Sequence, residues 1–280
     1  MIKKLIPNSL KHNILGPARR ELGAFFVDIG LSILKIKDPF VPPTRMDFVG
    51  GSDFKATGYE FLRYFTEFAN LQPQDSVLDI GCGIGRMALP LANYLRTGRY
   101  EGIDIVPKGI EWCQSNITPR FPNFHFQIAD IYNKFYNPRG IHKASEYKFP
   151  YPDETFDFVF LTSVFTHMLP LDTENYLREI TRTLKKGGRT LITWFILNSE
   201  SRNLMEKNSK VMQLNLNFGE QSNIRVLDTY YPENAVGYEE DYVARLYASN
   251  NLQINHPKQF GNWCARSEFT SFQDIIVATK

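Results

Sequence analysis

The apolar residues in the middle of the chain alternate between two spacings. Short, nearly continuous apolar runs predict buried strands, and the stretches between them carry apolar residues at helical spacing. Such alternation of strands and helices is typical of a parallel sheet covered by helices on both faces. The predicted strands are Ser76–Ile80, Tyr100–Ile103, Phe124–Ile128, Phe156–Leu161 and Thr190–Leu197, and the predicted helices are Arg86–Leu95, Pro107–Asn116 and Thr173–Leu184.

Three segments depart from this alternation. Phe54–Leu71 has helical spacing, so residues 1–71 are predicted to form a helical cap on a domain of residues 72–280. Residues 130–152 predict a long loop, and residues 198–236, which are polar and aperiodic, predict an inserted lid-like segment. Towards the C-terminus we expect a helix at Glu239–Ser249 and a closing pair of strands at Leu252–Phe260 and Phe269–Ala278.

Composition and charge narrow the classes of partner. The chain of 280 residues is 43% hydrophobic and 22% charged, which predicts a soluble globular fold. A net charge of +2, without a stripe of Lys and Arg, argues against nucleic acid as a partner. Cys82, Cys113 and Cys264 lack the spacing of a disulfide framework or a zinc site. We therefore expect reduced thiols, a cytoplasmic protein and no bound metal.

The first 36 residues leave two interpretations open. Residues 1–20 contain five Lys and Arg residues and no acid, and the apolar stretch Leu22–Leu34 is interrupted by Asp28, Gly30 and Ser32. This stretch is too short to span a bilayer and lacks a small-residue cleavage site, so secretion is not expected. We favour a helix that packs on the domain, and the alternative is peripheral contact of residues 1–36 with an anionic membrane surface.

The most informative segment is Val77–Arg86, which reads Val-Leu-Asp-Ile-Gly-Cys-Gly-Ile-Gly-Arg. Gly81, Gly83 and Gly85 leave room for a ligand where a strand turns into a helix, and free backbone amides there bind anionic groups. The dinucleotide fingerprint Gly-x-Gly-x-x-Gly fails, because Arg86 stands where its third glycine belongs. NAD is therefore the second choice of cofactor.

An acid completes this pattern. Asp104 ends the second predicted strand 25 residues after Asp79. At that place a carboxylate accepts hydrogen bonds from both ribose hydroxyls of a nucleoside-containing cofactor. The alternative is a helix cap before Pro107, and we favour ribose binding.

Further motifs follow the predicted strand ends, so that the series is Asp79–Arg86, Gly102–Ile105, Ala129–Asp130, Phe156–Val159 and Leu184–Gly188. Together these segments resemble the class I S-adenosylmethionine-dependent methyltransferase family over about residues 72–197. The resemblance implies a doubly wound, Rossmann-like α/β sheet of seven strands with a final antiparallel strand, and S-adenosylmethionine as cofactor. It also implies that Asp79 holds the methionine amino group, that Gly81, Cys82, Gly83 and Gly85 line the cofactor, that Asp104 holds the ribose, and that Asp130, Ile105 and Ile131 bind the adenine.

His167 is the candidate catalytic base. It follows the fourth predicted strand, at the edge where open α/β sheets bind ligands, and the alternative is a structural histidine at a strand-to-helix corner. Nearby polar residues and aromatic residues of later segments are expected to line the acceptor pocket. These are Thr162, Ser163, Thr166, Trp194, Tyr230, Tyr231 and Tyr238.

The predicted activity is metal-independent transfer of a methyl group to a hydroxyl oxygen of a small-molecule or glycan-type acceptor. A histidine base favours a hydroxyl acceptor, because a neutral amine attacks without a base. Two alternatives stay open: an NAD-dependent oxidoreductase, and a noncatalytic adaptor on the same fold.

Overall fold

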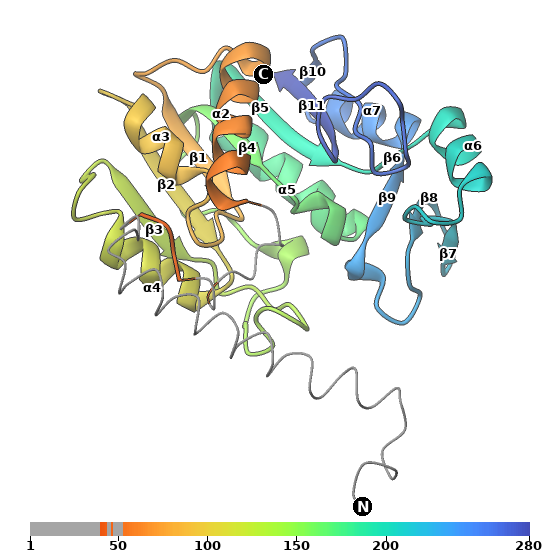
Figure 1. Ribbon diagram of the computed structural model, residues 1–280. Coiled ribbons are helices and arrows are strands. Elements are labelled where there is room, and N and C mark those ends of the chain that lie inside the picture. The colour runs from red at the N-terminus through yellow and green to blue at the C-terminus, as the bar shows by residue number, and fades with distance from the viewer. Residues whose placement is uncertain (1–39, 44–45, 47–52) are drawn as a thin grey trace, which may run out of the picture.

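A computed structural model of the chain describes residues 40–43, 46 and 53–280, and Figure 1 shows how their elements are arranged. A seven-stranded sheet with helices on both faces occupies the centre, and a four-stranded sheet lies beside it. Residues 1–36, for which the sequence allowed membrane contact, lie outside the described residues. Of the predicted N-terminal cap, the structure describes chiefly one helix, α2 (Phe54–Ala69).

The large sheet has the strand order β10-β11-β5-β4-β1-β2-β3. Strands β1 to β5 run parallel to their neighbours, whereas β11 is antiparallel to β5 and β10 to β11. This confirms the predicted seven-stranded sheet with a final antiparallel strand. The strands are β1 (Ser76–Ile80), β2 (Arg99–Asp104), β3 (Phe124–Ile128), β4 (Phe156–Leu161), β5 (Leu184–Trp194), β10 (Gln253–Ile254) and β11 (Asp274–Thr279).

Alternating side chains of the buried strands face two separate cores. In β4, Phe158 and Phe160 pack with α2, where the rings of Phe65 and Phe160 are 4.4 Å apart. Val159 and Leu161 belong to the core on the opposite face. Because both faces are covered, β4 is apolar at nearly every position. One face carries α2, α3 (Ala88–Tyr94) and α4 (Pro107–Asn116), and the other carries α5 (Pro170–Thr183) and α7 (Glu240–Ser249).

The predicted inserted segment, residues 198–236, contains regular structure that the sequence analysis did not assign. It contains helix α6 (Ser199–Lys207) and strands β7 (Leu216–Phe218) and β8 (Gln221–Val226). With β6 (Ile196–Leu197) and β9 (Val236–Glu239) these strands form a small sheet of order β6-β9-β8-β7. The prediction missed it because only Ile224 and Val226 of β8 are buried, which is too short an alternation to recognise.

Two further boundaries differ from the prediction. The segment Lys185–Gly188, expected to end a helix, lies within β5, where Gly187 and Gly188 exchange backbone hydrogen bonds with Lys280. The expected strand Leu252–Phe260 pairs regularly only over the two residues of β10. Both segments take their conformation from β11, a partner that is remote in the sequence.

A buried carboxylate links the two sheets where β5 passes into β6. Asp274, at the start of β11, accepts hydrogen bonds from the backbone amide of Ile196 (2.7 Å) and the indole nitrogen of Trp263 (2.7 Å). It also accepts from the amide of Gly261 and the guanidinium of Arg266. Each donor would be costly to bury unpaired, so this cluster ties the small sheet to the large one.

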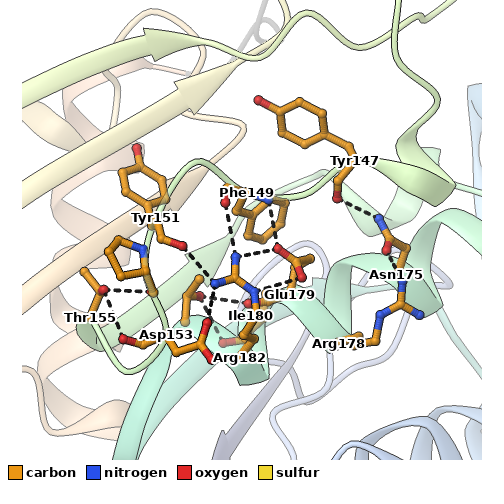
Figure 2. A network of polar contacts seen from close by, with 12 residues as sticks. Tyr147, Phe149, Tyr151, Asp153, Thr155, Asn175, Arg178, Glu179, Ile180 and Arg182 are labelled. Carbon is orange, nitrogen blue, oxygen red and sulfur yellow. Dashed lines mark hydrogen bonds and ion pairs between the residues drawn. The ribbon is translucent and has the colours of Figure 1, made fainter.

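The chain between β3 and β4 is anchored on α5 by the polar network in Figure 2. Arg182 donates to the carbonyl oxygens of Phe149 (3.1 Å) and Tyr151 (2.8 Å), and it pairs with Glu179 and Asp153. Two turns earlier on the helix, the side chain of Asn175 donates to the carbonyl of Tyr147 at 2.9 Å. This predicted long loop therefore returns to the sheet along a fixed path.

Candidate functional site

The turn between β1 and α3 has a backbone conformation that favours glycine. Gly81, Gly83 and Gly85 have φ values of +83°, +57° and +80°, a region that side chains with a Cβ disfavour. A Cβ at Gly81 would also lie 2.4 Å from Cγ2 of Val164. The amides of Gly81 and Cys82 both donate to the carbonyl of Ile103 in β2 (2.8 and 3.1 Å), which joins the turn to the neighbouring strand.

Asp104 reaches across to this turn. One of its carboxylate oxygens accepts a hydrogen bond from the amide of Gly83 at 2.7 Å, and the other accepts from the amide of Val106 at 2.8 Å. Burial raises the pKa of Asp104, and these backbone N–H groups oppose the rise. The structure thus brings together the two features, glycine turn and strand-end acid, that the sequence analysis paired.

Asp79 lies fully buried below the turn. Its Oδ2 accepts a hydrogen bond from the hydroxyl of Tyr100 at 2.6 Å, and its Oδ1 has no hydrogen-bond partner among the described residues. Burial raises the pKa of Asp79 to about 8, the Tyr100 hydrogen bond opposes that rise, and the negative Asp104 adds to it. A buried oxygen without a partner is a free acceptor for a ligand donor. The sequence analysis missed Tyr100, which carries no motif and is aligned by strand register.

The other predicted cofactor residues lie at the ends of β2 and β3. The amide of Ala129 donates to the carbonyl of Asp104 (2.9 Å), so the two strand ends are adjacent. Asp130 is half-buried, and its carboxylate accepts a hydrogen bond from the side-chain amide nitrogen of Asn137 at 3.3 Å. Ile131 is buried and Ile105 packs against the same core.

Cys82 is also buried, and burial holds the pKa of its thiol well above the usual range. A protonated, enclosed thiol is a poor nucleophile. Cys82 lies in the wall of the glycine turn. Cys113 and Cys264 are likewise free and buried.

His167 lies at the end of the 3₁₀ helix η3 (Phe165–His167), which follows β4. Its Nδ1 is 2.9 Å from the carbonyl oxygen of Glu233 in the 3₁₀ helix η4 (Pro232–Asn234). A carbonyl only accepts, so Nδ1 carries the proton of this hydrogen bond. In the neutral imidazole Nε2 is then left with a lone pair. The contact with Glu233 is one that sequence alone gave no sign of.

The polar residues after β4 meet the start of β11. Ser163 is exposed with φ +59°, its amide donates to Oγ1 of Thr193 (2.8 Å), and its hydroxyl donates to Oε1 of Gln273 (3.1 Å). Thr166 is buried and lies 3.5 Å from the Gln273 amide nitrogen, while Thr162 is half-buried. Gln273 is therefore an additional residue of this edge, and no motif in the sequence marks it.

The aromatic residues predicted to line the acceptor pocket fall into two groups. Trp194 and Tyr238 are fully buried. The indole nitrogen of Trp194 donates a hydrogen bond to the Tyr247 hydroxyl, and the Tyr238 hydroxyl donates one to the carbonyl of Met168. Trp194 and Tyr238 were expected to line the acceptor pocket, but the structure places both rings in the core. Tyr230 and Tyr231 lie near the surface beside η4, and Tyr230 is 74% exposed.

Neither a metal cluster nor a membrane span is found in residues 53–280 and the few described residues before them. No group of three or more His, Cys, Asp or Glu side chains there is arranged to hold a metal ion. No helix there is long and apolar enough to cross a bilayer.

Comparison with known proteins shows which protein family this segment resembles. A family model described as a methyltransferase domain matches residues 78–192, the segment from β1 to β5. A solved structure of an S-adenosylmethionine-dependent methyltransferase from Methanosarcina mazei shares the fold, with a TM-score of 0.50 and 19% identity over 75% of this chain and 94% of that one.

Curated relatives act on different acceptors. Phosphoethanolamine N-methyltransferase 3 of Arabidopsis thaliana is 29% identical over 53% of this chain and 27% of that protein. A fatty-acid O-methyltransferase of Mycolicibacterium smegmatis is 30% identical over 42% of this chain and 36% of that protein. A tRNA N(3)-cytidine methyltransferase of Gallus gallus is 26% identical over 41% and 29%. The matches thus span about a third or less of these relatives' lengths.

The matched segment includes the glycine turn, Asp104 and the central strands, and this decides for S-adenosylmethionine and against NAD as the cofactor. Residues 78–192 thus match the methyltransferase-domain family, and the chain has the fold of class I S-adenosylmethionine-dependent methyltransferases.

Proposed function

We propose that the chain transfers a methyl group from S-adenosylmethionine to a hydroxyl oxygen of a small-molecule or glycan-type acceptor. The observation that carries the oxygen assignment is the hydrogen bond from Nδ1 of His167 to the Glu233 carbonyl. That bond leaves Nε2 as the basic nitrogen, at the same sheet edge as the glycine turn. A lone pair held in one orientation there is suited to accept a proton from a hydroxyl group.

The cofactor half of the proposed site consists of the turn and the two buried acids. Each carboxylate oxygen of Asp104 accepts one backbone hydrogen bond and has a further lone pair for a ribose hydroxyl. The unpartnered Oδ1 of Asp79 is a fitting acceptor for the methionine ammonium group. Asp130, with Ile105 and Ile131, is proposed to contact the adenine.

The chemistry asks little of the protein beyond alignment. S-adenosylmethionine, when bound, supplies a methyl group on a sulfonium that is already a good leaving group. Holding the acceptor in line with that methyl group provides up to roughly 7 to 11 kcal/mol of the acceleration. Ser163 and Gln273, which are linked by a hydrogen bond, are proposed to position the acceptor, and His167 removes the hydroxyl proton.

Three other functions remain as alternatives. Phosphoethanolamine N-methyltransferases among the relatives make an amine a rival acceptor, and such an acceptor attacks in its neutral form without a base. A tRNA methyltransferase relative makes nucleic acid a rival acceptor class, against which the small net charge of +2 weighs. A noncatalytic adaptor would bind neither cofactor nor product.

The test is titration calorimetry of the chain with S-adenosylhomocysteine and, separately, with NAD. We expect binding of the former only, weakened about 100-fold or more in Asp104→Ala, because hydrogen bonds to a charged group contribute about 1.5–3 kcal/mol each. Asp157→Ala is the matched control, since Asp157 lies at the far end of β4 and pairs with Lys185. Circular dichroism checks that both variants fold.

Each outcome leads to a decision. Binding that survives in Asp104→Ala contradicts the proposed ribose site, and an absence of binding to the unmodified chain favours the adaptor. Binding as expected justifies a screen of hydroxyl and amine acceptors with radiolabelled S-adenosylmethionine, in which transfer to amines alone contradicts the oxygen assignment.

A further inference from the structure

The loop that follows β3 exposes several large apolar side chains to solvent. Tyr132, Phe135 and Tyr136 are each about half exposed, and Ile141 is 75% exposed. We call these four residues the aromatic rim. Soluble proteins seldom expose apolar side chains in such a group unless the surface contacts a partner.

The rim stands on a defined turn. The side-chain oxygen of Asn133 accepts hydrogen bonds from the amides of Phe135 (2.9 Å) and Tyr136 (3.0 Å), and Asn133 and Asn137 exchange two backbone hydrogen bonds of 3.0 Å. The two arms of the loop approach closely at Gly140, where an added Cβ would lie only 2.3 Å from the backbone of Ile131. Glycine therefore permits this close approach. The apolar side chains are therefore held outward by the loop's own structure.

The rim borders the proposed active site on its acceptor side. The ring of Phe135 lies 5.3 Å from that of Tyr231, and Nζ of Lys134 is 5.1 and 4.4 Å from the ring centres of Tyr230 and Tyr231. Tyr231 is two residues before Glu233, the partner of His167. Both loops project at the lower edge of the molecule in Figure 1. The rim thus links the end of β3 to the loop that orients His167.

The charged side chains of the loop that carries the rim are all basic. Residues 131–143 include Lys134, Arg139 and Lys143 and contain no Asp or Glu. All three basic side chains are exposed, and Lys143 pairs with Glu146 outside this stretch. Aromatic and aliphatic side chains interspersed with Lys and Arg are the composition of segments that lie at the interface of an anionic membrane.

We propose that the aromatic rim docks the active site on an anionic phospholipid surface, so that the acceptor is an amphiphile presented from the membrane. The nature of the acceptor rests on the proposed methyl transfer, whereas the docking does not. Two exposed aliphatic side chains, Ile141 in the rim and Leu171 in the first turn of α5 (69% exposed), favour lipid over single-stranded RNA. Aliphatic side chains gain from entering an acyl layer but offer no face for base stacking.

The experiment is flotation of the full chain with vesicles of phosphatidylcholine containing phosphatidylglycerol as the minor lipid, compared with pure phosphatidylcholine. We expect binding to the anionic vesicles only, reduced about tenfold in Phe135→Ser/Tyr136→Ser and about tenfold in Lys134→Glu/Arg139→Glu. The matched control is Tyr59→Ser/Phe269→Ser, which replaces one Tyr and one Phe with exposed fractions of 50% and 55%, against 48% and 49% in the rim.

Three results would overturn the proposal. The first is no vesicle binding by the unmodified chain, and the second is binding that the rim variants share undiminished with the control, which places the contact elsewhere. The third is binding to single-stranded oligouridine that exceeds vesicle binding and is lost in the same variants. S-adenosylhomocysteine affinity, measured alongside, stays unchanged in every variant if the cofactor site is as proposed, so failure of docking and failure of the proposed function are distinguished.

Discussion

In the proposed cofactor half of the site, the contacts join residues near one another in the chain, such as Asp104 and Gly83, which are 21 positions apart. In the proposed acceptor half, His167 contacts Glu233 across 66 positions and Ser163 contacts Gln273 across 110. The first half is built mainly from backbone atoms at the ends of β1 and β2. The second is built from side chains and loops that the small sheet and β11 bring to β4.

Because of this difference, the two halves tolerate different amino-acid substitutions. A turn with three glycines at positive φ tolerates few residues, so the cofactor half carries a motif that the sequence displays. The acceptor half tolerates any side chains that later segments bring to the edge, so changes there alter the acceptor and leave the cofactor in place. Variants should accordingly divide into those that affect cofactor affinity and those that affect turnover alone.

The largest expected effect is on turnover in His167→Ala. Loss of a general base lowers kcat by about 10² to 10⁴-fold, while the affinity for S-adenosylhomocysteine stays unchanged. His125→Ala is the matched control, because His125 is exposed on β3 and contacts Glu101. The measurement is the rate of radiolabelled methyl transfer to the acceptor found in the screen.

A second readout tests the orientation of His167 without an acceptor. Nitrogen-15 NMR of the histidine side chains is expected to show one neutral ring protonated on Nδ1, and that signal is absent in His167→Ala. If His167 is instead protonated on Nε2, its lone pair lies on Nδ1, which faces the Glu233 carbonyl. That result would contradict the proposed role of His167 as the base of the acceptor half.

An intermediate effect is expected from a single methyl group in the glycine turn. Gly81→Ala combines positive φ with a Cβ 2.4 Å from Val164, and we expect about 3 kcal/mol of lost stability together with weaker cofactor binding. Gly187→Ala is the control, because φ is +74° there but no atom lies within 4 Å of the added Cβ. That variant should lose about 1 kcal/mol by urea denaturation. Equal losses in the two would show that the turn is not tightly packed.

A separate effect is the pH dependence of the free energy of unfolding that Asp79 contributes. Its pKa of about 8 in the folded chain exceeds the unfolded value of about 3.9, so the folded state keeps a proton that the unfolded state releases. The associated stability is present below about pH 4 and is lost as pH rises towards 8, by at most about 1.4 kcal/mol per pH unit. Urea denaturation across this range should give a flatter profile for Asp79→Asn, and an unchanged profile would contradict the raised pKa.

Much of the fold followed from sequence because its elements are local. The strand Phe156–Leu161 and the helix Pro107–Asn116 were predicted with the bounds that the structure has, since an apolar run and an N-terminal proline are properties of adjacent residues. Helix Phe54–Leu71 was predicted within two residues of its observed end. The small sheet was missed, because its strands are short and depend on pairing with one another across the inserted segment.

The glycine turn, the acids Asp79 and Asp104 and the parallel sheet that carries them can be read from the residues alone, because backbone conformation and strand periodicity are set by neighbouring residues. The burial of Trp194 and Tyr238 in the core, the contact of Gln273 with Ser163 and the hydrogen bond of His167 to the Glu233 carbonyl are visible in the folded chain alone. These contacts arise when distant segments pack together, and packing accepts many residue types at each position, so no local pattern records them.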